Sequence, residues 1–494
     1  MRRHHSFRWR MAAPVLATCC LLMISPVALH AGGPLFVGGP TFGVDGQPFT
    51  WNPATMPIKY RVDGGPMSVA PSGQVVISNA QGITRVQQML QTWQNVSTAA
   101  VSFSNAGPIL PVAGFSDGDV SSAPEFAAVA GSCQSGAQSP IIFDANGRVL
   151  AELGADPLII GFSGQCALSK SGQIISDLVL LNGAFQDGVT QPQLAANQFN
   201  EAIIHEMGHF LGLDHSQINL DLFLNALNAG QFGTCDLDDL AGLPLMFPIS
   251  FCQARLDAGL PQLAPDDMAW ISKLYPSTNF AKTYATISGT IFSSDGQTPV
   301  QGVNVIARQL DDSATSKDES RRVAMSVVSG YRFTQNPGQT VTSNYLPCTP
   351  PGQRGCPVGG FLDDNSAGDV FGSRNSSFIG SYDIPVLAGA SYTVEVESVF
   401  GAFIGGSGVG PLRLPIALPG GIPEFWHQTE TSFDDPTQAD PISTSPGQTI
   451  PGTDVILNGT QPTFDQFEDP GANLLRHDLV PMPREDELQQ REDT

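Results

Sequence analysis

The sequence predicts an α+β protein of two domains, in which a mixed domain of helices and strands precedes an all-β sandwich. The first observation behind this prediction is length, because 494 residues exceed what one hydrophobic core normally spans. The second is a change of pattern near residues 277–285, after which only strands and turns are indicated. The third is composition, since 14% charged residues with 52 Gly and 39 Pro favour strands and long loops.

A basic and then apolar stretch opens the chain. Four arginines in "MRRHHSFRWR" precede the run "MAAPVLATCCLLMISPVAL", and small residues follow near Ala31. This pattern predicts that residues 1–31 are a secretory signal peptide, so we expect a secreted, extracellular or periplasmic protein. A membrane anchor is the alternative, and Pro14 and Pro26 disfavour it because they interrupt an already short run.

Charge and cysteine content narrow the partners and the compartment. The net charge of −23 argues against nucleic acid and anionic membranes as partners. Six cysteines lie outside the leader, and an even count in an exported chain implies disulfides, with free buried thiols as the alternative. Proximity along the chain favours three pairs: Cys133–Cys166, Cys235–Cys252 and Cys348–Cys356.

Residues 32–280 are predicted to form the mixed domain. "MPIKYRV" (56–62) alternates apolar and polar residues as a half-buried strand does, and "GITRVQQMLQTWQNVS" (82–97) has helical spacing. Three short apolar runs bounded by turn residues are further predicted strands: "SPIIFD" (139–144), "DPLIIGFS" (156–163) and "DLVLLNG" (177–183).

Two more helices complete this domain. The clearest one is expected from Gln193 to Leu211, with Gly212 in the left-handed conformation that ends many helices. The last one lies in "APDDMAWISKLYP", where Asp266 or Asp267 can cap its start and Pro276 stops it.

The stretch "HEMGHFLGLDH" carries the chemistry. His205 and His209 are four residues apart, so a helix presents both imidazoles to one ion. A sharp turn at Gly212 returns His215 as a third ligand, and three neutral histidines leave one tetrahedral position of Zn²⁺ open for water. Glu206 is then placed to act as general base. A chance match on an amphipathic helix is the alternative, and the five fixed identities of H-E-x-x-H-x-x-G-x-x-H disfavour it.

This motif resembles that of the metzincin peptidases, which pair it with a downstream Met-turn. Met246 in "LPLMFP" matches that turn, and the resemblance implies that it forms an apolar floor beneath the histidines; an ordinary core methionine is the alternative. "HFLGLDHS" and "DDMAWISKLYP" are most similar to the matrixins, peptidase family M10, over roughly residues 45–280. The resemblance implies one catalytic zinc, a protein or peptide substrate and hydrolysis of peptide bonds.

The chain departs from the matrixin pattern in three places. An insert at 217–245 separates the motif from Met246, and we expect it to narrow or cover the pocket that "FPISF" (247–251) would line in the family. No cysteine between the leader and the first strand is present to block the zinc. Oxygen ligands for Ca²⁺ occur, but a turn or a solvated acidic patch is the favoured interpretation: Asp144 and Asn146, or Asp236, Asp238 and Asp239.

Residues 285–460 are predicted to form the sandwich. "ISGTIFSSDGQTPVQGVNVIA" and "GSYDIPVLAGASYTVEVES" resemble the transthyretin-like domain of the carboxypeptidase regulatory type, here with an inserted loop at about 311–375. Phe425, Trp426 and His427 offer a contact for carbohydrate or protein, although core aromatics are the favoured interpretation. The polar, acidic tail at 461–494 is expected to be disordered.

The sequence therefore predicts a secreted zinc-dependent metalloendopeptidase with no membrane anchor. An exported zinc-binding adhesion or binding protein, whose metzincin-like domain cleaves nothing, is the first alternative. A secreted hydrolase of another bond is the second. The intact Glu206 favours the peptidase, because a purely structural zinc site does not need a general base.

Overall fold

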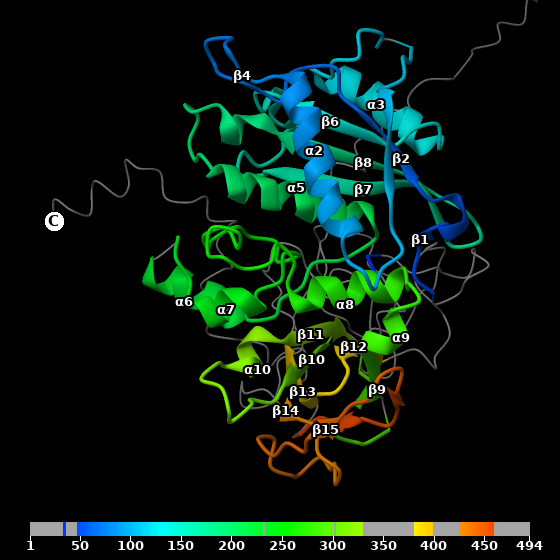
Figure 1. Ribbon diagram of the computed structural model, residues 1–494, viewed down its shortest axis with the longest axis vertical. Helices are drawn as coiled ribbons and strands as arrows, with labels where there is room; N and C mark the ends of the chain where they lie inside the picture. The colour runs from blue at the N-terminus through cyan, green and yellow to red at the C-terminus, as the bar shows by residue number, and fades with distance from the viewer. Residues whose placement is uncertain are drawn as a thin grey trace, which may run out of the picture.

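The computed structural model describes residues 33–35, 47–113, 115–230, 233–297, 299–300, 303–329, 380–398 and 424–458. The predicted leader at 1–31, the pair Cys348–Cys356 and the tail at 461–494 lie outside these residues. Helices and several sheets alternate along the described chain, in agreement with the predicted α+β class (Figure 1). No helix of the described part has the length and apolar character needed to cross a membrane.

The first half of the chain is built on a mixed sheet. Five of its strands run parallel, including the short strand β1 at one end of the row, and a sixth strand pairs antiparallel with β8. In spatial order they are β1 (Thr50–Trp51), β8 (Gln173–Asn182), β6 (Pro140–Asp144), β2 (Ile58–Val62) and β5 (Phe103–Pro108), with β7 (Gly161–Leu168) antiparallel to β8.

Helices cover both faces of this sheet. Strand alternation directs Val179 and Leu181 of β8 towards α2 (Asn79–Gln94) and α5 (Ala196–Phe210), whereas Leu178 and Leu180 meet the opposite layer. The opposite layer consists of α3 (Ala123–Gln134) and α4 (Arg148–Leu153). Figure 1 shows α2 and α5 crossing in front of the sheet.

Two sheets make up most of the second half. One contains β11 (Ala324–Val328), β10 (Val303–Gln309), β13 (Ser391–Ser398) and β14 (Glu424–Phe425), with β15 (Ile442–Ser443) also on β13. The other contains β12 (Ser381–Leu387), β9 (Tyr284–Phe292) and β16 (Thr449–Ile450), with β17 (Val455–Ile456) on β9. Their buried residues, such as Ile287, Val305 and Val394, belong to one apolar core with the first half.

Several elements differ from the expectation. The strand expected at 156–163 begins only at Gly161, because residues 156–160 form a turn closed by Asp156. The long loop expected at 311–375 contains α10 (Glu319–Arg322) and β11. The insert holds two helices, α6 (Leu220–Ala229) and α7 (Leu237–Gly242).

The start of α8 (Pro265–Leu274) confirms one of the two expected caps. Its N-cap residue is Ala264, and Asp267 caps the helix from the first turn, where its Oδ2 accepts the Ala264 N–H at 2.7 Å. Asp266 accepts from Ser326 N–H of β11. Pro265 takes the first helical position, which needs no N–H.

Both disulfides that fall on described residues have the predicted pairing. Cys133–Cys166 joins α3 to β7, with Cα atoms 5.6 Å apart. Cys235–Cys252 closes the insert onto the segment after Met246, with Cα atoms 5.5 Å apart.

Helix α8 connects the two halves (Figure 1). Trp270 donates from Nε1 to the carbonyl of Ser326 in β11 at 2.7 Å, and Asp266 Oδ1 accepts the Ser326 N–H at 2.9 Å. Lys273 forms an ion pair with Asp383 of β12 at 2.7 Å. The junction therefore combines polar contacts with a continuous apolar core.

Asp266 makes folding stability depend on pH. Burial, and then the neighbouring Asp267 carboxylate, raise the pKa of Asp266 from 3.8 to about 8. The folded state therefore keeps a proton that the unfolded chain releases, so the free energy of unfolding should fall as pH rises from 3.8 to about 8. Asp266→Asn, which keeps an acceptor for Ser326, should reduce that fall in urea titrations between pH 5 and pH 8. Equal slopes in the two proteins would contradict this role.

Candidate metal centre

Three histidine side chains converge on one point. His205 and His209 project from the last two turns of α5, and His215 returns from the loop beyond that helix. Their Nε2 atoms are 2.9 to 3.1 Å apart in all three pairs. Among the residues that the structure describes, this is the one group of three or more potential side-chain ligands close enough to share an ion.

The backbone between His209 and His215 makes this return possible. Gly212 has φ +87°, and the N–H groups of Gly212 and Leu213 donate to the carbonyls of His209 and Gly208. These two bonds close the helix end and reverse the chain direction. The segment Gly33–Leu35 braces the turn, since Leu35 N–H donates to Gly212 and Asp214 N–H donates to Gly33.

Hydrogen bonds at the other ring nitrogens fix the tautomers. His205 Nδ1 lies 2.8 Å from the Leu245 carbonyl, and His209 Nδ1 lies 2.9 Å from the Leu213 carbonyl. A carbonyl only accepts, so each Nδ1 carries the proton and each Nε2 presents a lone pair to the centre. Burial lowers the pKa of His205 to about 4, which keeps this imidazole neutral near pH 7.

The donor set fits a tetrahedral divalent ion. With metal–nitrogen bonds of about 2.0–2.1 Å, two ligands of such an ion lie roughly 3.3 Å apart. The Nε2 separations of 2.9–3.1 Å are close to that value. Three neutral imidazoles also leave one position of a tetrahedron without a protein ligand.

Glu206 lies beside the histidines and is nearly excluded from water. Its residue is 7% exposed, and its carboxyl faces the start of β7, where a Cβ on Gly161 would stand 3.2 Å from Oε1. Burial, and then the nearby Asp177, raise the pKa of Glu206 to about 8. A cation held by the histidines would act in the opposite direction.

Asp177 is a member of this site that sequence reasoning did not identify. It is buried on β8, and Ser163 of β7 donates its hydroxyl to Oδ1 at 2.8 Å. Burial raises the pKa of Asp177 well above its usual range. Nothing in the local run "DLVLLNG" marks this aspartate, because its proximity to Glu206 comes from the pairing of β7 with β8.

Met246 packs against α5 at Gly208, the residue before His209. Gly208 faces its sulfur, and a Cβ at position 208 would collide with Sδ, so the helix approaches Met246 only through a glycine. The backbone of this turn is tied to the carboxylate of Asp267, which accepts the N–H groups of Leu245 at 2.8 Å and Met246 at 3.1 Å. Since the Leu245 carbonyl in turn orients His205, Asp267 acts on the site through the turn.

The insert packs against the residues that follow Met246. Phe223 of α6 lies 6.2 Å from Phe247 and 5.4 Å from Phe251, measured between ring centroids, and those two rings are 5.4 Å apart. Phe247 and Phe251 are buried, whereas Phe223 is only partly buried. Much of the apolar surface of α6 is therefore incompletely covered.

The acidic groups considered for Ca²⁺ have structural partners. Asp144 accepts the N–H groups of Val149 and Leu150 at the start of α4. Asp236 is the N-cap of α7. The remaining carboxylates form ion pairs with α10: Asp238 with Arg322, and Asp239 with Arg321.

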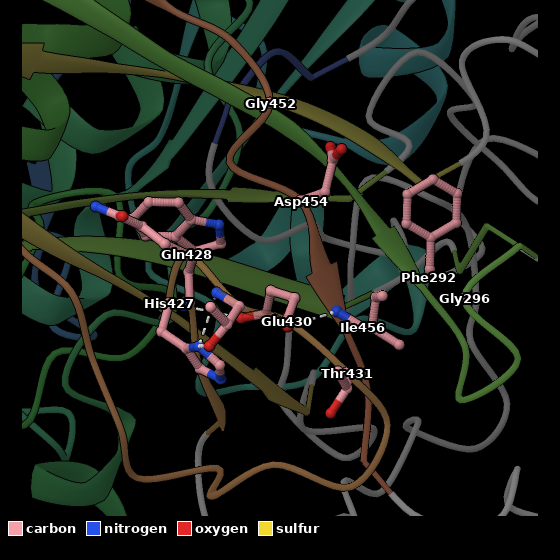
Figure 2. Close-up of a pocket in the computed structure, with 11 residues that line it drawn as sticks. Phe292, Gly296, His427, Gln428, Glu430, Thr431, Gly452, Asp454 and Ile456 are labelled. Atoms are coloured by element: carbon pink, nitrogen blue, oxygen red, sulfur yellow. Dashed lines mark hydrogen bonds between the residues drawn. The ribbon is translucent and has the colours of Figure 1, made fainter.

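A cavity of about 590 Å³ lies in the second half of the chain, and none of the three histidines lines it (Figure 2). Trp426 and Phe292 contribute its apolar lining, and Trp426 packs partly buried against the main core. Its carboxylates support the local backbone: Glu430 accepts from the N–H groups of His427 and Ile456, and Asp454 accepts from Thr290.

Comparison with known proteins adds no relative. No protein-family model matches the sequence, and a search of curated proteins gave no significant match.

Removal of one imidazole should abolish tight metal binding. We expect His209→Ala to lower the zinc bound per chain from about one ion to less than about a tenth, because two ligands hold the ion far more weakly than three. Elemental analysis after dialysis measures this. His427→Ala, which removes a histidine of the second half, should retain the metal, and equal loss in both variants would contradict the assignment of the ligands.

Gly208 should be intolerant of a side chain. Gly208→Ala should destabilise the chain by about 1–3 kcal/mol, since Cβ would press on Met246 and Trp93. Gly131→Ala is the matched control on α3, where Cβ meets nothing, and it should stabilise by about 0.5–1 kcal/mol. Urea unfolding measures both, and two changes of the same sign would refute the packing argument.

Proposed function

We propose that this chain is a secreted zinc metalloendopeptidase of the matrixin-like metzincin class. The observation that carries the proposal is the arrangement of three imidazole Nε2 atoms within 3.1 Å of each other, with Glu206 directly after His205 on the same helix. A structural zinc site normally uses four protein ligands. Three ligands beside a buried carboxyl are the arrangement of a hydrolytic site.

Zinc held by His205, His209 and His215 would make water acidic enough to react near neutral pH and would polarise the peptide carbonyl. Glu206 would accept a proton from the attacking water and deliver it to the departing amine. A carboxyl whose pKa lies near the working pH suits both transfers. Burial, and then Asp177, raise the pKa of Glu206 and favour its protonated form, which donates to the amine.

The apolar cluster that follows Met246 in the sequence supports a preference for an apolar side chain in the substrate. Phe247 and Phe251 occupy the segment expected to line the pocket next to the scissile bond, and Phe223 packs on both. We propose that this cluster receives an apolar side chain of the polypeptide and that Phe223 limits its size.

Two further parts of the proposal concern the setting of the enzyme. The disulfides Cys133–Cys166 and Cys235–Cys252 support an oxidising compartment outside the cytosol. The two sheets of residues 284–458 support a transthyretin-like sandwich, in which the cavity lined by Trp426 and His427 is the proposed contact for carbohydrate or protein.

The general base gives the sharpest test. Glu206→Ala, and the isosteric Glu206→Gln, should keep about one zinc per chain yet lose about 10²–10⁴-fold in the rate of casein or gelatin cleavage. Glu152→Gln, which alters an exposed carboxyl paired with Arg148, serves as the control. A chelator should stop cleavage by the wild type.

Three outcomes separate the alternatives. Undiminished cleavage by Glu206→Ala would refute the mechanism. A wild-type chain that binds zinc but cleaves no protein would favour the adhesion or binding protein. Cleavage of esters or glycosides without peptides would favour a hydrolase of another bond.

Phe223 should set the size of the accepted side chain. Phe223→Ala should raise kcat/KM about tenfold for peptides with a large apolar residue after the cleaved bond, relative to peptides with alanine there. Peptide-library profiling by mass spectrometry measures the shift. An unchanged profile would show that α6 does not border the substrate.

A further inference from the structure

We infer that the second half of the chain is a working part of the metal centre: strands β10, β11 and β13 hold the loop His215–Asn219 and so set the position of His215. The inference rests on the proposed zinc site. His215 is the single ligand outside α5, so its distance from the other two depends on whatever fixes this loop. We call residues 215–219 the ligand loop.

Ser216, directly after the ligand, connects three parts of the molecule. It is fully buried, and its N–H donates to the Met246 carbonyl at 3.0 Å. Its hydroxyl lies 3.2 Å from that of Ser326 in β11. Ser326 also accepts from Trp270 and donates its N–H to Asp266, both of α8. One position of β11 therefore contacts both the ligand loop and this helix.

The side chains of the next two residues contact the sheet of the second half. Gln217 donates to Glu397 Oε1 of β13 at 2.9 Å, and Asn304 of β10 donates to the same oxygen at 2.8 Å. Ile218 has no exposed surface and packs with Ile306 and Ala324, which are equally buried. The ligand loop thus contributes an apolar side chain to a small core that belongs to β10 and β11.

Asn219 ends the loop in a conformation that needs support. Its φ is +59°, the one positive value among described residues other than glycine, and such a residue is retained only where its surroundings fix it. Arg308 of β10 donates to Oδ1 at 2.9 Å, and Nδ2 donates to the Arg321 carbonyl at 3.1 Å. Arg308 is itself paired with Glu395 at 2.5 Å.

These contacts couple metal binding to the docking of the second half. On one side His215 is fixed by the turn at Gly212. On the other it is fixed by contacts with β10, β11, β13 and α10, together with the bond from Ser216 N–H to Met246. Outer contacts that orient a ligand typically change metal affinity about 10–100-fold. Zinc binding should in return stabilise the docked second half, because a ligand that needs this arrangement favours it.

Asn219→Gly in the full chain tests the inference. Glycine accepts the positive φ, so the variant removes the amide contacts with Arg308 and Arg321 and leaves the Arg308–Glu395 pair intact. We expect its zinc dissociation constant, measured by competition with a chromophoric chelator, to rise at least about tenfold. The Co²⁺-loaded protein should also show a changed visible spectrum, which reports the third ligand directly.

Lys273→Ala is the matched control. It removes the Lys273–Asp383 ion pair from the same junction, away from the ligand loop, and should lower the melting temperature while changing the zinc dissociation constant less than about twofold. Arg308→Lys, which keeps a cation beside Glu395, should give a smaller rise than Asn219→Gly and serves if the glycine variant does not fold.

Unchanged zinc affinity in both loop-side variants, or equal weakening in Lys273→Ala, would overturn the inference. These readouts do not depend on cleavage. A wild type that binds zinc without proteolysis leaves the coupling testable, whereas a wild type that binds no zinc refutes both the site and the coupling.

Discussion

Three imidazole nitrogens must meet within about 3 Å, and only two of them come from one rigid helix. This constraint organises much of the surrounding structure. The helix supplies His205 and His209 at a spacing that its own geometry fixes. His215 instead requires a glycine at the bend, a turn under the helix and a surface on which the following loop can rest. A loop left free would spread the third nitrogen over several ångströms, and the ion would lose a ligand.

Helix α8 satisfies part of that constraint through two adjacent carboxylates. Both carboxylates are buried. Asp267 accepts from the backbone of Leu245 and Met246, whereas Asp266 accepts from the backbone of Ser326 in β11. Successive helix residues point about 100° apart, so neighbours in the sequence address different halves of the molecule. The second half is therefore joined to the site through the same helix that supports the turn. The sheet of β10, β11 and β13 also contacts the loop after His215, so it supports the site as well as forming part of the second half.

Patterns within short stretches of the sequence were enough to predict the features that depend on neighbouring residues. The strands at Ile58–Val62 and Pro140–Asp144, the helix that carries the motif, the glycine bend and two disulfide pairs follow from periodicity, turn chemistry and proximity. Helices α4 and α7 were missed because they are short, and α3 because its Ala and Gly residues give little amphipathic signal. Helix α6 has an apolar face, but its stretch was interpreted only as an insert. The roles of Asp177, Asp267 and Arg308 were also missed, because each depends on partners that are distant along the chain, and single-sequence patterns carry no information on such pairings.

The brace at Gly33–Leu35 has a consequence for the order of events during synthesis. It pairs with residues 212–214, while the ligand loop needs partners as late as Glu397. Contacts so distant in sequence form slowly, because long chain segments must first be closed. The ribosome synthesises Gly33–Leu35 long before Glu397 of β13. Helix α5 can therefore form early, while His215 does not yet have a fixed position. The group of three histidines is therefore assembled late, and a nascent or truncated chain carries it incomplete.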